Sequence, residues 1–86
     1  MKIESNKRFD KQLRKCKKRG FDTSELYIII EKIKSNSVEA KHRVHKWKGT
    51  DNIWELHIKP DWLLLYRKES DTLYLLDTGT HSDLIK

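Results

Sequence analysis

Side chains that could transfer protons are concentrated in the second half of this chain. All four histidines lie beyond residue 40, at His42, His45, His57 and His81. Asp61 follows His57 by four residues, across a connection that contains a proline. Because an imidazole has an unperturbed pKa of about 6.5, it can both accept and donate a proton near neutral pH. The sequence therefore predicts general acid–base chemistry, provided that the fold brings these residues together.

RNA cleavage is a reaction that needs both a base and an acid. The base takes the proton of a 2′-hydroxyl, which attacks the adjacent phosphate, and the acid protonates the departing 5′-oxygen. Cations stabilise the charge that develops on the phosphate oxygens. Three lysines are the candidates for this role: Lys46, Lys48 and Lys59.

Two other interpretations of the histidines remain open at this point. They could be ordinary surface or strand residues, because many exposed histidines have no chemical task. They could also bind zinc, since His42 and His45 have a helical ligand spacing that His57, His81 or Asp61 could complete. No cysteine pair or HExxH pattern accompanies that spacing, so we expect no metal.

The positive charge is unevenly distributed along the chain. The formal net charge is +6, but residues 1–20 alone hold nine Lys and Arg against two acidic residues. A second basic stretch, residues 41–48, alternates with two histidines and Trp47. Such a pattern suits a polyanion with bases that can stack. A solvated helix face or an acidic protein partner would explain the first stretch equally well.

Two helices are expected in the first half of the chain. Apolar residues at Phe9, Leu13 and Cys16 form a helical stripe over residues 7–19, and Gly20 follows where a C-terminal cap belongs. As the single cysteine, Cys16 excludes an internal disulfide, fits a reducing compartment, and is expected to pack in the core. Asp22 resembles the start of a capping box and opens a second helix that runs to about residue 35.

The pattern changes to that of strands in the second half. Apolar residues alternate with Glu55, His57 and Lys59 over residues 54–59, which predicts one apolar and one polar face. The continuous apolar runs 62–66 and 73–76 predict strands covered on both faces, and residues 2–5 a short N-terminal strand. We therefore expect an α+β fold in which two N-terminal helices pack on one face of a small antiparallel sheet, with His57 on the other.

Length and composition predict a single domain over residues 1–86. The chain has no apolar run near the roughly 18 residues of a membrane span, and its N-terminus lacks the apolar core of a signal peptide. We expect a cytoplasmic protein with no membrane contact.

Two blocks of the sequence resemble a known family. His57–Tyr66 (HIKPDWLLLY) and Thr78–Leu84 (TGTHSDL) are similar to the signature of YafQ-type toxins in the RelE superfamily. The order of helices and strands and the chain length agree over essentially all 86 residues. The resemblance implies a type II toxin that cleaves mRNA in the 30S A site of the ribosome without a metal or other cofactor. It also implies a monomeric toxin that a cognate antitoxin neutralises in a higher-order complex.

The resemblance also implies roles for particular residues. The histidine and aspartate of the first block and the histidine of the second are catalytic in the family, which marks His57, Asp61 and His81. A further family histidine precedes this strand; His42 matches it best, and His45 is the competing assignment.

Two positions depart from the family pattern. Ile85 stands where a C-terminal residue, usually aromatic, helps to position RNA. Asp77 stands where many relatives have an arginine that stabilises phosphate, a role that a carboxylate cannot take. Arg67 or one of the lysines is then expected to substitute, or cleavage is weaker. A non-enzymatic nucleic-acid-binding module, a zinc-dependent hydrolase and a scaffold remain the alternatives.

Overall fold

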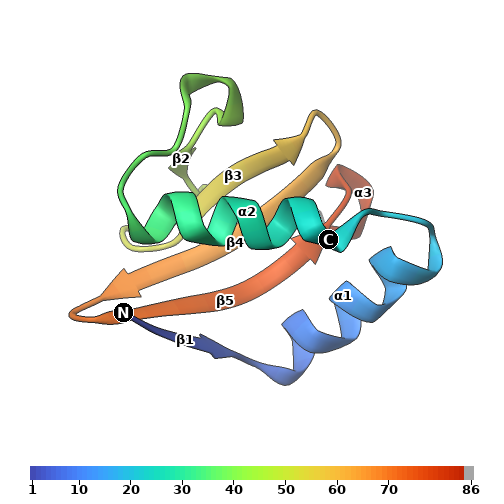
Figure 1. Ribbon diagram of the computed structural model, residues 1–86, viewed down its shortest axis with the longest axis horizontal. Helices are drawn as coiled ribbons and strands as arrows, with labels where there is room; N and C mark the ends of the chain where they lie inside the picture. The colour runs from blue at the N-terminus through green and yellow to red at the C-terminus, as the bar shows by residue number, and fades with distance from the viewer. Residues whose placement is uncertain (85–86) are drawn as a thin grey trace.

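The computed structural model describes residues 1–84, in which the two long helices cover one face of a five-stranded sheet (Figure 1). This confirms the expected α+β architecture. In chain order the elements are β1 (Lys2–Ser5), α1 (Lys7–Lys18), α2 (Thr23–Lys34), the 3₁₀ helix η1 (Ala40–His42), β2 (His45–Lys46), β3 (Trp54–Lys59), β4 (Trp62–Glu69), β5 (Thr72–Gly79) and α3 (His81–Leu84).

The sheet is mixed, with the strand order β1-β5-β4-β3-β2. β3, β4 and β5 form the expected antiparallel meander, whereas β1 pairs with β5 in parallel, with Ile3 opposite Leu73. The N-terminal strand was therefore predicted correctly, and its parallel pairing makes the sheet mixed. The chain passes through both helices and the meander before it returns beside β1, and such a long connection permits parallel pairing.

Local side chains explain where the helices begin and end. The Asn6 side chain accepts a hydrogen bond from the amide of Phe9 at 2.7 Å, which caps α1. Gly20 then adopts a φ of +88°, and the amide of Phe21 donates to the carbonyl of Cys16, which closes the C-terminus as expected. At α2, Asp22 accepts from the amide of Ser24 at 3.0 Å.

The main core lies between the helices and one face of the sheet. Its members include Phe9 and Cys16 from α1, Leu26 from α2, and Leu56 and Leu64 from the sheet. Cys16 is fully buried, and this burial raises the pKa of its thiol, so its predicted packing role is confirmed. Among residues 1–84, no helix is long and apolar enough to cross a membrane.

The opposite face of the sheet carries a smaller apolar cluster. Leu63 and Leu65 of β4 pack there with Leu84 of α3, and Leu76 lies against them. Since β4 also faces the main core, it is buried on both sides, as its apolar run predicted. This second cluster anchors α3 to the face of the sheet that carries His57.

Candidate active site

Pairing across the sheet brings His57 and His81 together. His57 of β3 lies opposite Leu63 of β4, and Leu63 lies opposite Gly79, the last residue of β5. The helix α3 begins at His81, shortly after Gly79. His81 therefore lies near the row of paired residues formed by His57, Leu63 and Gly79. Its ring centroid lies 5.5 Å from that of His57.

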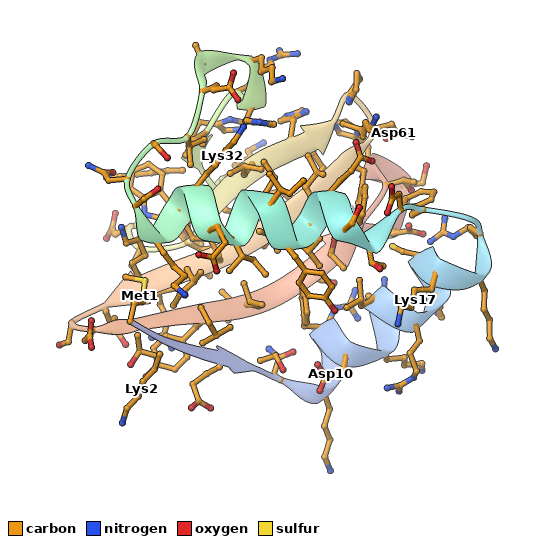
Figure 2. The ribbon with its side chains drawn as sticks, in the orientation of Figure 1. Met1, Lys2, Asp10, Lys17, Lys32 and Asp61 are labelled. Atoms are coloured by element: carbon orange, nitrogen blue, oxygen red, sulfur yellow. The ribbon has the colours of Figure 1, made fainter. Side chains whose placement is uncertain are left out.

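Asp61 orients the imidazole of His81. From the β3–β4 turn (Figure 2), one oxygen of Asp61 accepts the backbone N–H of His81 at 3.0 Å and lies 2.6 Å from its Nδ1. The backbone hydrogen bond, followed by that of the imidazole, lowers the pKa of the Asp61 carboxyl below its ordinary value. Because a carboxylate only accepts, Nδ1 carries the hydrogen, and Nε2 of a neutral His81 has a free lone pair.

Glu55 lies at the centre of the site and is buried. One carboxylate oxygen is 3.0 Å from Nε2 of His45, and the other is 3.3 Å from Nε2 of His57. The side chains of Glu55 and His57 are about 90% buried, whereas those of His45 and His81 are half exposed. Nδ1 of His45 faces the carbonyl of Arg43 at 2.9 Å, so both ring nitrogens face oxygen acceptors.

We use the name histidine cluster for five residues: His45, Glu55, His57, Asp61 and His81. The structure thus brings three of the four predicted catalytic residues together and adds His45 and Glu55 to them.

His42 occupies a different place. It is buried in η1, and its Nδ1 donates to the backbone carbonyl of His57 at 2.7 Å rather than facing the imidazole of that residue. Its Nε2 has no hydrogen-bond partner among residues 1–84. His42 therefore braces the outer edge of β3, and its catalytic role stays a prediction. Of the two competing histidines, His45 is the one whose ring joins the cluster.

The predicted phosphate-binding lysines are dispersed. Lys59 extends to Glu25 of α2, 3.0 Å away, and Lys46 lies over the ring of Trp54. Glu25 thereby pairs with Lys59 and not with the start of its own helix, so the reciprocal capping box does not form. Lys48 is exposed in the loop between β2 and β3.

Two other predicted RNA contacts lie away from the cluster or cannot be placed. Arg67 pairs with Glu69 and stacks on Tyr74. It is four residues along β4 from Leu63, which corresponds to about 13 Å at the rise of a strand. Ile85 lies outside the described residues.

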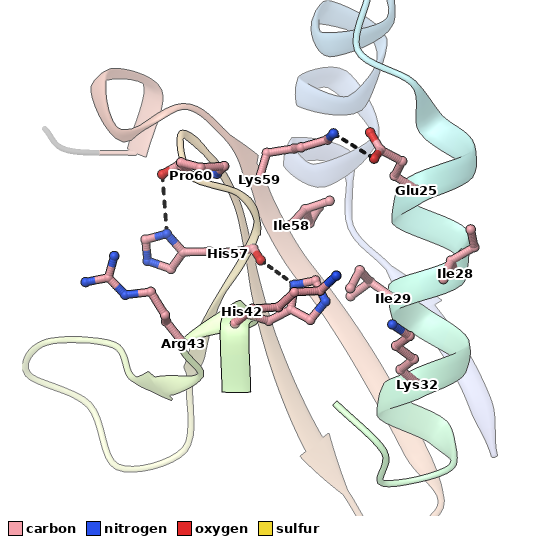
Figure 3. A pocket seen from close by; sticks show the side chains of 11 residues that line it. Glu25, Ile28, Ile29, Lys32, His42, Arg43, His57, Ile58, Lys59 and Pro60 are labelled. Atoms are coloured by element: carbon pink, nitrogen blue, oxygen red, sulfur yellow. Dashed lines mark hydrogen bonds and ion pairs between the residues drawn. The ribbon is translucent and has the colours of Figure 1, made fainter. Parts of the chain in front are cut away.

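Sequence reasoning passed over Arg43 and Glu55. Arg43 adopts a left-handed conformation, with φ of +50°, and lines a pocket together with His57 (Figure 3). Its place between His42 and His45 was the only available signal. Glu55 had a clearer one, because it alternates with His57 and Lys59 on the polar face of the predicted strand.

Asp77 is neutralised by an ion pair. A bulge in β5 sets Asp77 opposite Leu65, on the same sheet face as Glu55 and His57. The Nε of Arg8, from α1, lies 2.7 Å from the Asp77 carboxylate, which is mostly buried. The carboxylate is thus offset by a cation that the helix supplies, although no phosphate-binding arginine stands at this position.

The cluster also contains donors that could hold a metal ion. Ligand atoms of Glu55, His57 and His81 all lie within 4.8 Å of one another. Imidazole nitrogens and a carboxylate oxygen are donors that suit zinc or copper. The residues present therefore fit a divalent ion as well as proton transfer.

The close approach of α3 to β5 requires a glycine. Gly79 has a φ of +150°, and a Cβ there would lie 2.7 Å from Cβ and a carboxylate oxygen of Asp83. Asp83 in turn accepts the amide of Thr80 and pairs with Arg19, which ties α3 to the end of α1.

We expect Gly79→Ala to displace α3 and to lower activity, because His81 moves with that helix. The strained φ should also destabilise the fold by about 1–3 kcal/mol. Cleavage assays and chemical denaturation measure the two effects. Gly49→Ala is the matched control, since Gly49 also has a positive φ but open space around it. Equal activity losses in the two variants would contradict this explanation.

Comparisons with known proteins agree with this fold. The family model described as the bacterial toxin of the type II toxin–antitoxin system, YafQ, matches residues 1–86. This chain belongs to the YafQ toxin family. The mRNA interferase toxin YafQ of Escherichia coli strain B / BL21-DE3 is 30% identical over 88 residues, covering 95% of this chain and 92% of the relative.

Solved YafQ-like structures share the fold over nearly the whole chain. A metal-bound toxin from Helicobacter pylori has a TM-score of 0.91 at 36% identity, with 99% of each chain covered. YafQ in the E. coli DinJ–YafQ complex has a TM-score of 0.89 at 26% identity, with 98% of this chain and 97% of that chain covered. The recognition of a YafQ-type, RelE-like toxin from its sequence blocks is thereby confirmed.

Proposed function

We propose that this YafQ-family toxin is an endoribonuclease that cleaves mRNA in the ribosomal A site by metal-independent acid–base chemistry. The observation that carries the proposal is the His81 imidazole, which Asp61 orients and which lies 5.5 Å from the ring of His57. Relatives that cover most of this chain are named mRNA interferases, which supports RNA as the substrate.

The two imidazoles divide the proton transfers between them. Neutral His81 takes the proton of the 2′-hydroxyl at Nε2, and the 2′-oxygen attacks the phosphorus to form a 2′,3′-cyclic phosphate. The bond from phosphorus to the 5′-oxygen breaks, and this oxygen receives a proton from His57. Glu55 places its carboxylate oxygens 3.3 Å from Nε2 of His57 and 3.0 Å from Nε2 of His45, and so helps to position both rings.

Cations hold the RNA strand around this centre. Arg43 shares a pocket wall with His57 and is the cation best placed for the phosphate. Lys46 and Lys48 extend the basic surface along the loop that precedes β3. Arg67 is too distant for the reacting phosphate and contacts another part of the strand.

The partners in this proposal are mRNA on the ribosome and a cognate antitoxin. The E. coli relative is found in a complex with DinJ, and α1 here exposes a dense row of cations, including Lys17 (Figure 2). An acidic or amphipathic antitoxin segment would complement that row. The resulting affinity should fall as ionic strength rises.

The nature of the RNA ends tests the mechanism. Incubated with ribosomes that carry a defined mRNA, the toxin should produce 2′,3′-cyclic phosphate and 5′-hydroxyl ends. Because ribosomes themselves require Mg²⁺, the EDTA treatment is applied to the toxin beforehand, and activity should survive it.

Loss of activity after chelation and recovery with Zn²⁺ would instead show a zinc-dependent hydrolase built on Glu55, His57 and His81. Binding of RNA without any cleavage would show a non-enzymatic binding module.

A further inference from the structure

A pocket of about 430 Å³ lies next to the histidine cluster, between α2 and the segment that contains η1 (Figure 3). Its size falls within the range of about 300–1,000 Å³ found for small-molecule sites. His57 and Arg43 are among its lining residues, and Figure 3 shows the His57 imidazole and the Arg43 side chain on the side of β3 away from α2. The pocket therefore reaches the proposed catalytic centre around the outer edge of that strand.

The walls of this pocket combine an apolar surface with positive charge. Ile28, Ile29 and Ile58 supply the apolar part, and Ile28 is 55% exposed although it is a large aliphatic residue. The charged residues that line the pocket are four cations and one acid: Lys32, Lys41, Arg43, Lys59 and Glu25. A ligand that combines a flat apolar group with an anionic group would match this lining.

His42 adds a polar group that the protein leaves unpaired. It is 94% buried, and it lines the pocket. Its Nδ1 donates to the carbonyl of His57, so a neutral ring has its lone pair at Nε2, which has no partner within residues 1–84. Buried polar atoms are nearly always hydrogen-bonded, so this nitrogen calls for an N–H or O–H donor from a ligand.

We infer that this pocket binds a nucleotide of the substrate RNA beside the cleaved phosphate, with the base against Ile28 and the phosphate on Lys41 and Arg43. The inference rests on the proposed function and extends it, since the pocket would influence which sequences are cut. Neither Lys41 nor Arg43 has an ion-pair partner in the described part of the chain, which leaves both able to bind phosphate. Continuity with His57 favours RNA over an acidic peptide.

The test uses the full-length toxin and a hexaribonucleotide whose 2′-O-methyl groups prevent cleavage. In an NMR titration, the methyl signals of Ile28, Ile29 and Ile58 should shift together with the ring signals of His57. Ile28→Ala and Lys41→Ala should each weaken binding by about three- to tenfold. Lys41→Ala should also reduce the slope of log affinity against log salt by about 0.7, as expected for one phosphate contact on a single strand.

Two matched variants serve as controls. Tyr27 neighbours Ile28 on α2 and is equally exposed at 55%, and Lys34 is a lysine of the same helix; neither lines the pocket. Tyr27→Ala and Lys34→Ala should leave binding within about twofold, well below the loss of one specific contact. On cleaved mRNA, Ile28→Ala should change the preferred nucleotide beside the cut, whereas Tyr27→Ala should not.

Several results would overturn the inference. If the ring signals of His57 and His81 shift while the three isoleucine methyls do not, the pocket is not a subsite, although the proposed function stands. If an Asp- and Glu-rich peptide shifts the methyls and RNA does not, the pocket is a protein-docking site. If RNA moves neither set of signals and mRNA is not cleaved, the inference fails together with the proposed function.

Discussion

His81→Ala should lower the rate of mRNA cleavage by about 10²–10⁴-fold, the usual contribution of one positioned proton-transfer group. His81 combines three properties that suit it as the base. Asp61 fixes its tautomer, its side chain is 45% exposed to incoming RNA, and one of its ring nitrogens lies within 4.8 Å of ligand atoms of Glu55 and His57. Growth inhibition in cells should disappear along with the activity in vitro.

The fold should survive this substitution. The imidazole is half exposed, and Asp61 still accepts the backbone N–H of residue 81 in the variant. Circular dichroism and thermal unfolding would verify this. Ser82→Ala, at the next and exposed position of α3, is the control and should remain toxic. A His81→Ala protein that still cleaves mRNA would refute the proposed mechanism.

The Asp61–His81 contact should persist through the neutral range. The folded protein lowers the pKa of Asp61 below its ordinary value of 3.8, so the carboxylate contributes stability above that pH. The contribution is lost as the pH falls through the lowered pKa. Near neutral pH the Asp61 carboxylate is therefore ionised and continues to orient His81.

Glu55→Gln should lower cleavage at pH 7 by about 10²-fold, the lower end of what an acid–base contact contributes. The substitution keeps the shape of the side chain but removes the charge that both His45 and His57 face. Without the carboxylate, both imidazoles lose the charged oxygen that their Nε2 atoms face.

A pH–rate profile separates this positioning role from a structural one. The pH–rate profile of Glu55→Gln should differ from that of the unaltered toxin, because the substitution removes the charge that lies beside both imidazoles. Glu69→Gln, an exposed glutamate of β4 that pairs with Arg67, should leave the profile unchanged. A Glu55→Gln protein with an unaltered profile would show that Glu55 only supports the fold.

Local patterns were sufficient to predict the two long helices and the strands β1, β3, β4 and β5. The alternation around His57 correctly predicted which face of β3 is polar, and Gly20 correctly marked the end of α1. These signals depend on residues a few positions apart, and the backbone period converts them directly into structure. The two motif blocks likewise indicated the family.

Contacts over long sequence distances could not be read in the same way. A bulge turns Asp77 toward the sheet face that carries His57. Arg8, which neutralises Asp77, lies 69 residues earlier in the chain. The choice between His42 and His45 depended on the two-residue strand β2, which is too short to leave a periodic pattern.

The histidine cluster shows this division most clearly. By itself, the sequence determined that histidines and Asp61 lie on the sheet half and that His57 occupies its polar face. Only the tertiary structure decided that His81 and Asp61 meet beside His57, that Glu55 joins two imidazoles, and that His42 turns into a separate pocket. Composition and spacing specify which groups are available, whereas pairing register and the path of the connecting loops determine which of them touch.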